Sequence, residues 1–185
     1  ILKMADYHYK NFGLKRVYYS GYIPINQEQN LLPAVGTPPP LIRENRLYQS
    51  DWLMRFYGFK QDEIVNEKFP NLELDIDPKL SWALRHPECF PVDLNRADYH
   101  MILRVPGIGV QSAKKIISAR RFGRLHIDQV KKIGISYSKA RYFIRCADTP
   151  AFQKEVSSQH IRHQITQQMQ SKYTKQLSPQ LSLGF

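Results

Sequence analysis

Apolar side chains recur every three or four positions over residues 1–12, 44–57 and 77–85. This spacing favours amphipathic helices, because it places the apolar residues on one face. Gly13 follows the first stretch at a position where glycine commonly ends a helix. Asp77 opens the third stretch as an N-cap. The sequence therefore predicts helices in most of the first half of the chain.

Residues 14–23 have a different pattern, rich in β-branched and aromatic side chains, and Pro24 ends it. We predict a strand here. A helix, a glycine and a strand in this order are typical of the last step of an α/β domain. The chain begins at Ile1, which we take as a sign of a longer or processed polypeptide. A lone edge strand packed on helices is the alternative.

A further pair of helices is predicted on either side of Pro106-Gly107-Ile108-Gly109. Two glycines allow the backbone to adopt positive φ and to approach a partner closely. The turn opens directly into the second helix, whose N-terminal N–H groups and positive dipole end favour an anion such as phosphate. We expect Ile108 to fit between the two helices. The alternative is a tight turn that serves packing alone.

The same pattern returns 27 residues later in a weaker form. The shift pairs Leu103 with Val130, Gly107 with Gly134, Ala113 with Ala140 and Ile117 with Ile144. Gly109 becomes Ser136, so the second copy loses one flexible position. We therefore expect the first turn to be the better phosphate site.

Charge is concentrated in the same region. The 185-residue chain has a formal net charge of +11, and residues 99–146 hold eleven Lys and Arg against Asp128 alone. A field this concentrated favours a polyanionic partner, with nucleic acid first and an acidic membrane surface second. The alternative is that these residues form an ordinary solvated basic surface that binds no ligand.

Three regions follow from these patterns: residues 1–90, a basic module at 91–147 and a Gln/Ser-rich tail at 148–185. No apolar run approaches the ~18–20 residues that a membrane helix needs, so we expect no membrane partner. Two cysteines provide neither a disulfide framework nor a four-thiolate site, and they favour a reducing, cytoplasmic location. The histidines have no metal-ligand spacing, so no metal site is predicted.

Pro-Gly-Ile-Gly followed by Ala113 resembles the helix-hairpin-helix motif of DNA-binding proteins. The resemblance implies that a paired module binds duplex DNA through its phosphates, without sequence preference. Enzymes of this class that act as glycosylase-lyases have a nucleophilic lysine where this chain has Gln111, so that activity is not expected. Docking of a partner protein or RNA by the basic face is the alternative function. The implied DNA-binding residues are Arg104, Gly107, Ile108, Gly109, Val110, Lys114, Lys115, Lys139 and Arg141.

A second resemblance covers roughly residues 1–147. It rests on the segments Lys15–Ser20, Thr37–Glu44, Arg46–Leu53, Arg55–Phe59 and Asp75–Lys79, in this order before the hairpin. These segments, in this order, resemble the C-terminal part of the radical S-adenosylmethionine (SAM) proteins of DNA modification or repair. This implies an upstream barrel in the parent chain, with a late barrel strand at residues 14–23.

The family's barrel binds a [4Fe–4S] cluster through Cys-x3-Cys-x2-Cys, and the cluster cleaves S-adenosylmethionine. Cys89 and Cys146 do not have that spacing, so the cluster ligands are expected outside this chain, and no catalytic residue is assigned within it. A DNA-repair protein is an implied further partner. The expected fold is mostly α with a partial α/β start, followed by a tandem helix-hairpin-helix whose second copy is degenerate.

Overall fold

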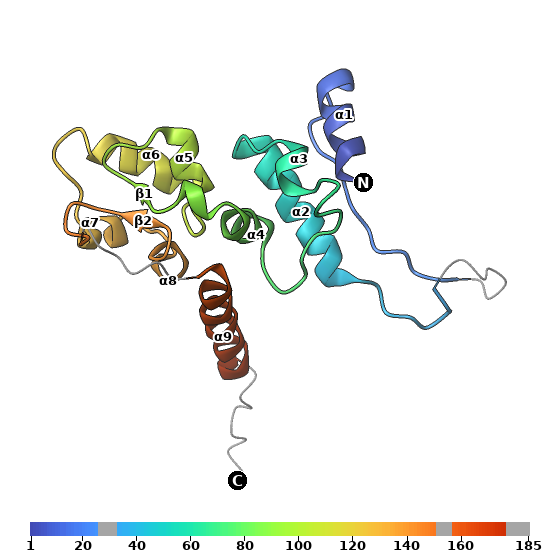
Figure 1. The fold of residues 1–185 in the computed structure, drawn as a ribbon. Coiled ribbons are helices and arrows are strands. Elements are labelled where there is room, and N and C mark those ends of the chain that lie inside the picture. Colours follow the sequence, from blue (N-terminus) through green and yellow to red (C-terminus); the bar gives the residue numbers. More distant parts are fainter. Residues whose placement is uncertain (26–32, 151–156, 177–185) are drawn as a thin grey trace, which may run out of the picture. The chain divides into compact units, whose positions relative to one another are not determined.

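Helices make up most of the structure, as predicted. It is a computed structural model that describes residues 1–25, 33–150 and 157–176, the last eight of these by their backbone only. The chain divides into two compact units, Ile1–Trp82 and Ala83–Phe185. The division lies within a helix, a few residues before the charge-based boundary near residue 90. Figure 1 shows the elements of both units.

The first unit is built from helices, and α1 packs against both α2 and α3. Gly13 ends the first helix in the left-handed conformation, with φ 62°, as expected. Asp77 caps the last one, because its Oδ1 accepts a hydrogen bond from the Leu80 N–H at 2.9 Å. The helices are α1 (Leu2–Phe12), α2 (Leu41–Phe56), α3 (Gln61–Ile64) and α4 (Pro78–Arg85), of which α4 continues into the second unit.

A buried carboxylate joins three parts of this unit. Asp51 on α2 is 1% exposed. It accepts hydrogen bonds from the Tyr9 hydroxyl of α1 and from the Arg55 Nε, the latter at 2.9 Å. Tyr9 also accepts the Val17 N–H at 3.0 Å, and Arg55 donates to the Lys15 carbonyl at 3.1 Å. A buried charge is tolerated only when it is paired in this way, so the network fixes residues 15–17 against both helices.

The prediction of a strand over residues 14–23 is wrong. The first unit's described residues contain no strand. Side chains of α1 and α2, rather than a neighbouring strand, bind the backbone of this segment. The residue pattern indicated an extended chain correctly, but a strand also needs a second strand beside it.

The second unit contains two helical hairpins and one small sheet. Strands β1 (Val92–Asp93) and β2 (Ile144–Arg145) pair in parallel, with Val92 opposite Ile144, so the entry to the hairpins lies beside their exit. The hairpin helices α5 and α6 pack against each other around Ile102, Ile108 and Ile116, which are all at most 1% exposed. The helical elements are η1 (Pro87–Cys89), α5 (Tyr99–Arg104), α6 (Val110–Ala119), α7 (Ile127–Lys132), α8 (Tyr137–Ala140) and α9 (Ser158–Gln176).

Part of the expected Gln/Ser-rich tail is the helix α9, on which Ile161 and Ile165 are buried. Residues 151–156 and 177–185 of the tail lie outside the described residues. In the part of the chain that the structure describes, every helix is too short or too polar to cross a membrane.

Asn95 bridges two segments of the second unit and does not cap a helix. Asp98 caps α5 instead, accepting the Met101 N–H at 2.8 Å. The Asn95 Oδ1 accepts the Leu125 N–H at 2.7 Å, and its Nδ2 donates to the Leu125 carbonyl at 3.2 Å. Asn95 therefore ties the segment before the first hairpin to the segment before the second.

We predict that Asn95→Ala destabilises the protein by about 1–2 kcal/mol, because the buried Leu125 N–H loses its acceptor. Urea denaturation followed by circular dichroism measures the change. Arg96→Ala is the matched control, since the Arg96 side chain is exposed and its nearest approach to Asp93 is 3.9 Å. Equal stability of the two variants would contradict the bridging role of Asn95.

Alkaline pH is expected to destabilise the first unit through Tyr19. Burial, with a smaller contribution from the Asp51 charge, raises the pKa of Tyr19, and a smaller rise affects the pKa of Tyr9. A raised folded-state pKa gives stability that is complete below the unfolded value of about 10 and is lost as the pH rises above it.

Tyr19→Phe reduces this loss and leaves only the smaller contribution of Tyr9. The Tyr19 hydroxyl is buried and has no hydrogen-bond partner among the described residues, so the variant keeps its stability at neutral pH. Thermal unfolding at pH 7 and at pH 10.5 tests the prediction. An alkaline loss in Tyr19→Phe that equals or exceeds that of the parent chain would contradict it.

Candidate nucleic-acid interface

The turn between α5 and α6 makes a sharp reversal at Gly107, where φ is 87°. The Ile108 side chain is 1% exposed, as expected for a residue held between the two helices. Gly109 is the N-cap of α6 with φ −93° and ψ 172°, which is ordinary extended backbone. The expectation of positive φ at both glycines is therefore correct for Gly107 and wrong for Gly109.

Close approach gives Gly107 a second reason to be glycine. A Cβ at this position would lie 2.6 Å from the Ser136 carbonyl oxygen and 3.3 Å from the Ala140 nitrogen. Both are backbone atoms of the second hairpin, so they have little freedom to move aside. The partner that Gly107 approaches is thus the other hairpin of the same unit.

The second hairpin repeats the geometry of the first at the predicted shift of 27 residues. Gly134 has φ 92°, matching Gly107, and Ser136 is the N-cap of α8 as Gly109 is of α6. The copies differ in length, because α8 has four residues and α6 has ten. A Cβ at Gly134 would meet no atom within 4 Å, so only the first turn is closed against its neighbour.

Two hydrogen bonds join the turns directly. The Ser136 N–H donates to the Gly107 carbonyl at 2.9 Å, and the Ser112 Oγ donates to the Gly134 carbonyl at 3.2 Å. Each positive-φ glycine therefore has its carbonyl held by the opposite hairpin. Sequence reasoning identified the repeat but missed Ser112, whose polar side chain on the first turn of α6 was the available signal.

The N-terminus of α6 has unused donors. The first backbone bond at this end runs from the Ala113 N–H to the Gly109 carbonyl at 2.9 Å. Among the residues that the structure describes, the N–H groups of Gly109, Val110 and Gln111 have no acceptor. Together with the helix dipole, such a group of donors can bind a phosphate oxygen. Gly107 and Ile108 instead shape the turn.

The predicted cationic residues lie on several elements. Lys114 and Lys115 are exposed in the middle of α6, three and four residues after the last of its free donors, Gln111. Arg104 is half-buried in the last turn of α5, and Lys139 is half-buried on α8. Arg141 follows α8 and stacks on the Tyr142 ring, 4.7 Å from its centroid. Lys114 and Lys115 are thus the two predicted cations that share a helix with the free donors.

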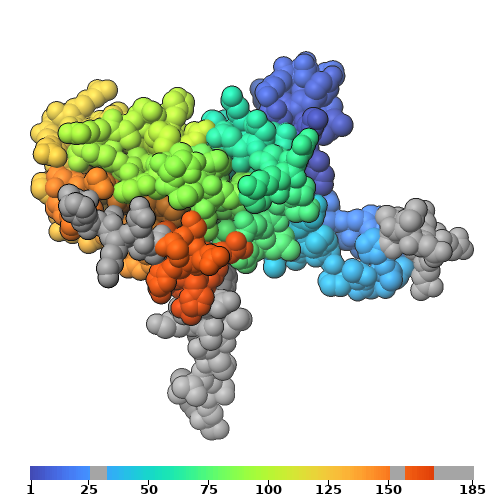
Figure 2. Space-filling view, in the orientation of Figure 1, coloured from blue at the N-terminus to red at the C-terminus, as the bar shows by residue number. Residues whose placement is uncertain are grey.

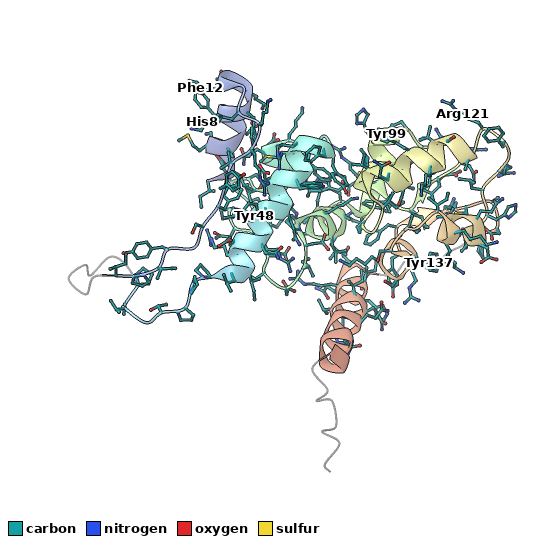
Figure 3. All side chains as sticks on the ribbon, turned by 180° about the vertical axis from the view of Figure 1, so that it is seen from behind. His8, Phe12, Tyr48, Tyr99, Arg121 and Tyr137 are labelled. Atoms are coloured by element: carbon teal, nitrogen blue, oxygen red, sulfur yellow. The ribbon has the colours of Figure 1, made fainter. Side chains whose placement is uncertain are left out.

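Not all of the basic stretch is available for a ligand. Arg120 Nη1 donates to the carbonyls of Ala97 and Leu94, at 2.6 and 3.2 Å, so this side chain holds the fold together. Arg121 is exposed beyond the C-terminal end of α6 (Figure 3), and that end lies about 15 Å from Gly109 along the helix axis. The positive charge is therefore divided between the two ends of α6.

The residues present do not fit the cluster that the radical SAM resemblance implies for the parent chain. The sequence has two cysteines, and three thiolates are needed. Burial raises the pKa of the Cys146 thiol to about 11 and, to a smaller extent, the pKa of Cys89. No group of three His, Cys, Asp or Glu side chains that could hold a metal occurs among the described residues. No chemical step through a cluster follows for this chain.

We predict that Gly107→Ala destabilises the second unit more than Gly134→Ala. Both substitutions place a Cβ at positive φ, which costs about 1–2 kcal/mol. The substitution at Gly107 adds the clash with the Ser136 carbonyl, whereas Gly134 faces open space. Chemical denaturation of the two variants measures the difference, and an equal loss of stability would show that the turns are not in close contact.

No known protein family, curated protein or solved structure matches this chain.

Proposed function

We propose that residues 91–147 form a paired helix-hairpin-helix module that binds the phosphates of duplex DNA without sequence preference. The observation that carries the proposal is the set of free N–H donors at Gly109, Val110 and Gln111, presented by a sharp glycine turn. They lie in a segment of 48 residues whose balance of charge is +10. Backbone donors contact phosphates and do not distinguish one base from another.

The link between the turns supports binding to two places on one duplex. Hydrogen bonds between Ser136 and Gly107 and between Ser112 and Gly134 fix the distance between the hairpins before DNA arrives. A preformed pair avoids the entropy cost of ordering two separate sites. The first hairpin supplies amides, and the short α8 of the second contributes mainly charge through Lys139 and Arg141.

The exposed surface of the second unit favours DNA over the alternative of a docked protein. Among the described residues of this unit, Phe122 is the one large apolar side chain that is strongly exposed, at 90%. Protein interfaces usually have an apolar centre, whereas nucleic-acid interfaces are polar and positively charged. One aromatic ring at the far end of α6 does not make such a centre.

The association with a radical SAM enzyme of DNA modification or repair is the second part of the proposal. Its support is the order of segments through residues 1–147, which resembles the C-terminal part of that family. In this proposal the paired hairpins bring the enzyme to DNA, and chemistry takes place in a barrel encoded upstream. Cleavage of S-adenosylmethionine by a longer native polypeptide, but not by this chain, tests that part separately.

Val110→Pro tests the amide contact with little damage to the helix. Val110 is the first residue of α6, where proline is well tolerated, and Gly109 already has the extended backbone that must precede proline. Losing one charge-assisted hydrogen bond is expected to weaken binding of a short duplex about tenfold or more. Fluorescence anisotropy measures the affinity, and circular dichroism confirms that the variant is folded.

The salt dependence tests the charge contacts. Affinity for duplex DNA is expected to fall with salt by about 0.9 log unit per log unit for each phosphate neutralised. The double variant Lys114→Gln/Lys115→Gln should lower this slope by about 1–2, because both side chains are exposed on the helix that presents the free amides. Arg121→Gln, at the other end of α6, is the matched control and should change the slope less. A salt-independent affinity, or equal effects at both ends of α6, would contradict the proposal.

A further inference from the structure

The second unit contains a cavity of about 820 Å³, separate from the turns of the hairpins. Its lining residues come from the end of α4 and the chain that follows it, from the chain between α8 and β2, and from the start of α9, all within this unit. Figure 2 shows the start of α9, in orange-red, at the surface. The volume lies within the range of about 300–1,000 Å³ that is typical of small-molecule sites.

Much of the cavity lining is apolar. Leu84 of α4 and Ile161 of α9 contribute aliphatic side chains. Phe90, Pro91 and Phe143 contribute rings, and the two phenylalanine rings meet edge to face with their centroids 5.0 Å apart. Aromatic side chains bind flat ligands well, and nucleic-acid bases are among them. The lining therefore suits a ligand with a flat, largely apolar body.

Two arginines also line the cavity, and neither has a carboxylate partner in the described part of the chain. Arg145 on β2 is half-buried, and its Nε is buried without a hydrogen-bond partner. Its guanidinium group forms no ion pair with any described residue. Arg141 stacks on the Tyr142 ring and donates a hydrogen bond to its hydroxyl. Because a partly buried charge without a partner is costly, the cavity favours an anionic ligand.

The acidic residue of the lining does not neutralise these arginines. Glu88 is exposed, and its carboxylate lies 2.8 Å from the His86 Nδ1. Both guanidinium groups therefore remain for the ligand. A phosphate monoester carries a charge of about −1.5 to −2 at pH 7, so it matches two guanidinium groups better than a single carboxylate does.

The start of α9 adds hydrogen-bond donors to the same cavity. Ser157 precedes the helix, and its Oγ accepts the His160 N–H at 3.3 Å while its carbonyl accepts the Ile161 N–H at 3.0 Å. The N–H groups of Ser158 and Gln159 have no acceptor among the described residues. Ser157 and Ser158 line the cavity, so the positive end of this 19-residue helix also favours an anion there.

We propose that this cavity binds a nucleotide, whose phosphate contacts Arg141 and Arg145. The base packs against the rings of Phe90 and Phe143, which a lone inorganic phosphate would leave uncovered. Two sources share this chemistry, a free nucleotide and the phosphorylated end of a DNA strand. The cavity is separate from the free amides of α6, so the inference does not rest on the proposed binding of duplex DNA.

Arg145→Gln tests the proposed phosphate contact. The Arg145 guanidinium has no described partner, so the substitution breaks no hydrogen bond, and the variant should be at least as stable as the parent chain. Isothermal titration calorimetry of the whole chain with deoxyadenosine 5′-monophosphate measures the affinity. Loss of a charge-assisted contact should weaken binding about tenfold or more.

Arg124→Gln is the matched control. Arg124 is exposed in the same unit and does not line the cavity, so the variant removes an equal charge from another place. It should bind the nucleotide like the parent chain. Val110→Pro, at the start of α6, should also leave nucleotide binding unchanged, so failure of this proposal can be distinguished from failure of the proposed DNA contact.

Fragments of the nucleotide test whether both parts of the cavity contribute. Deoxyadenosine and inorganic phosphate, titrated separately, should each bind at least about tenfold more weakly than the nucleotide, since each lacks one of the two contacts. The nucleotide should also raise the Tm of the parent chain more than that of Arg145→Gln. A nucleotide that does not bind, or that binds Arg145→Gln equally well, would overturn the proposal. Either fragment binding as tightly as the nucleotide would do the same.

A short single strand of DNA with and without a 5′-phosphate distinguishes the two sources. If the phosphate strengthens binding to the parent chain but not to Arg145→Gln, the ligand is a strand end. If the phosphate makes no difference while the mononucleotide binds, the ligand is the free nucleotide.

Discussion

The close approach of Gly107 to Ser136 is the constraint on which the second unit depends. A backbone carbonyl of one hairpin accepts the backbone N–H of the other at 2.9 Å, leaving no space for a Cβ at Gly107. This contact, with the Asn95 bridge to Leu125, turns two short helical hairpins into one body. Neither hairpin has helices long enough to be stable alone, so the packing between them is what holds each turn in shape.

The proposed function follows from that rigidity. Because the first turn is held by the second, the free amides at the start of α6 keep a fixed direction, and exposed lysines of the same helix add charge. Arg120, in contrast, is used inside the fold, bound to the Ala97 and Leu94 carbonyls. The basic residues of this segment therefore form two groups. The exposed lysines can contact a ligand, whereas Arg120 is used inside the fold.

Sequence patterns predicted local structure well and interactions between distant segments poorly. Gly13, Gly107 and Gly134 were recognisable because glycine at the end of a helix or in a tight turn has few physical explanations. Residues 14–23 were recognisable as extended, but whether a strand lies beside them depends on residues far away in the sequence. The bridging role of Asn95 is not readable from the sequence, because its partner, Leu125, is thirty positions away. The division of charge between the two ends of α6 required knowing where the helix ends.

The central claim is that backbone amides at the start of α6 contact phosphate, and an NMR titration of the labelled chain with a short DNA duplex tests it most directly. The account predicts that the amide signals of Gly109, Val110 and Gln111 shift first and furthest, and that the shifts diminish as salt is added. Shifts confined to the region around Phe122 and Arg124, or absent from the turn while DNA is bound, would contradict the claim.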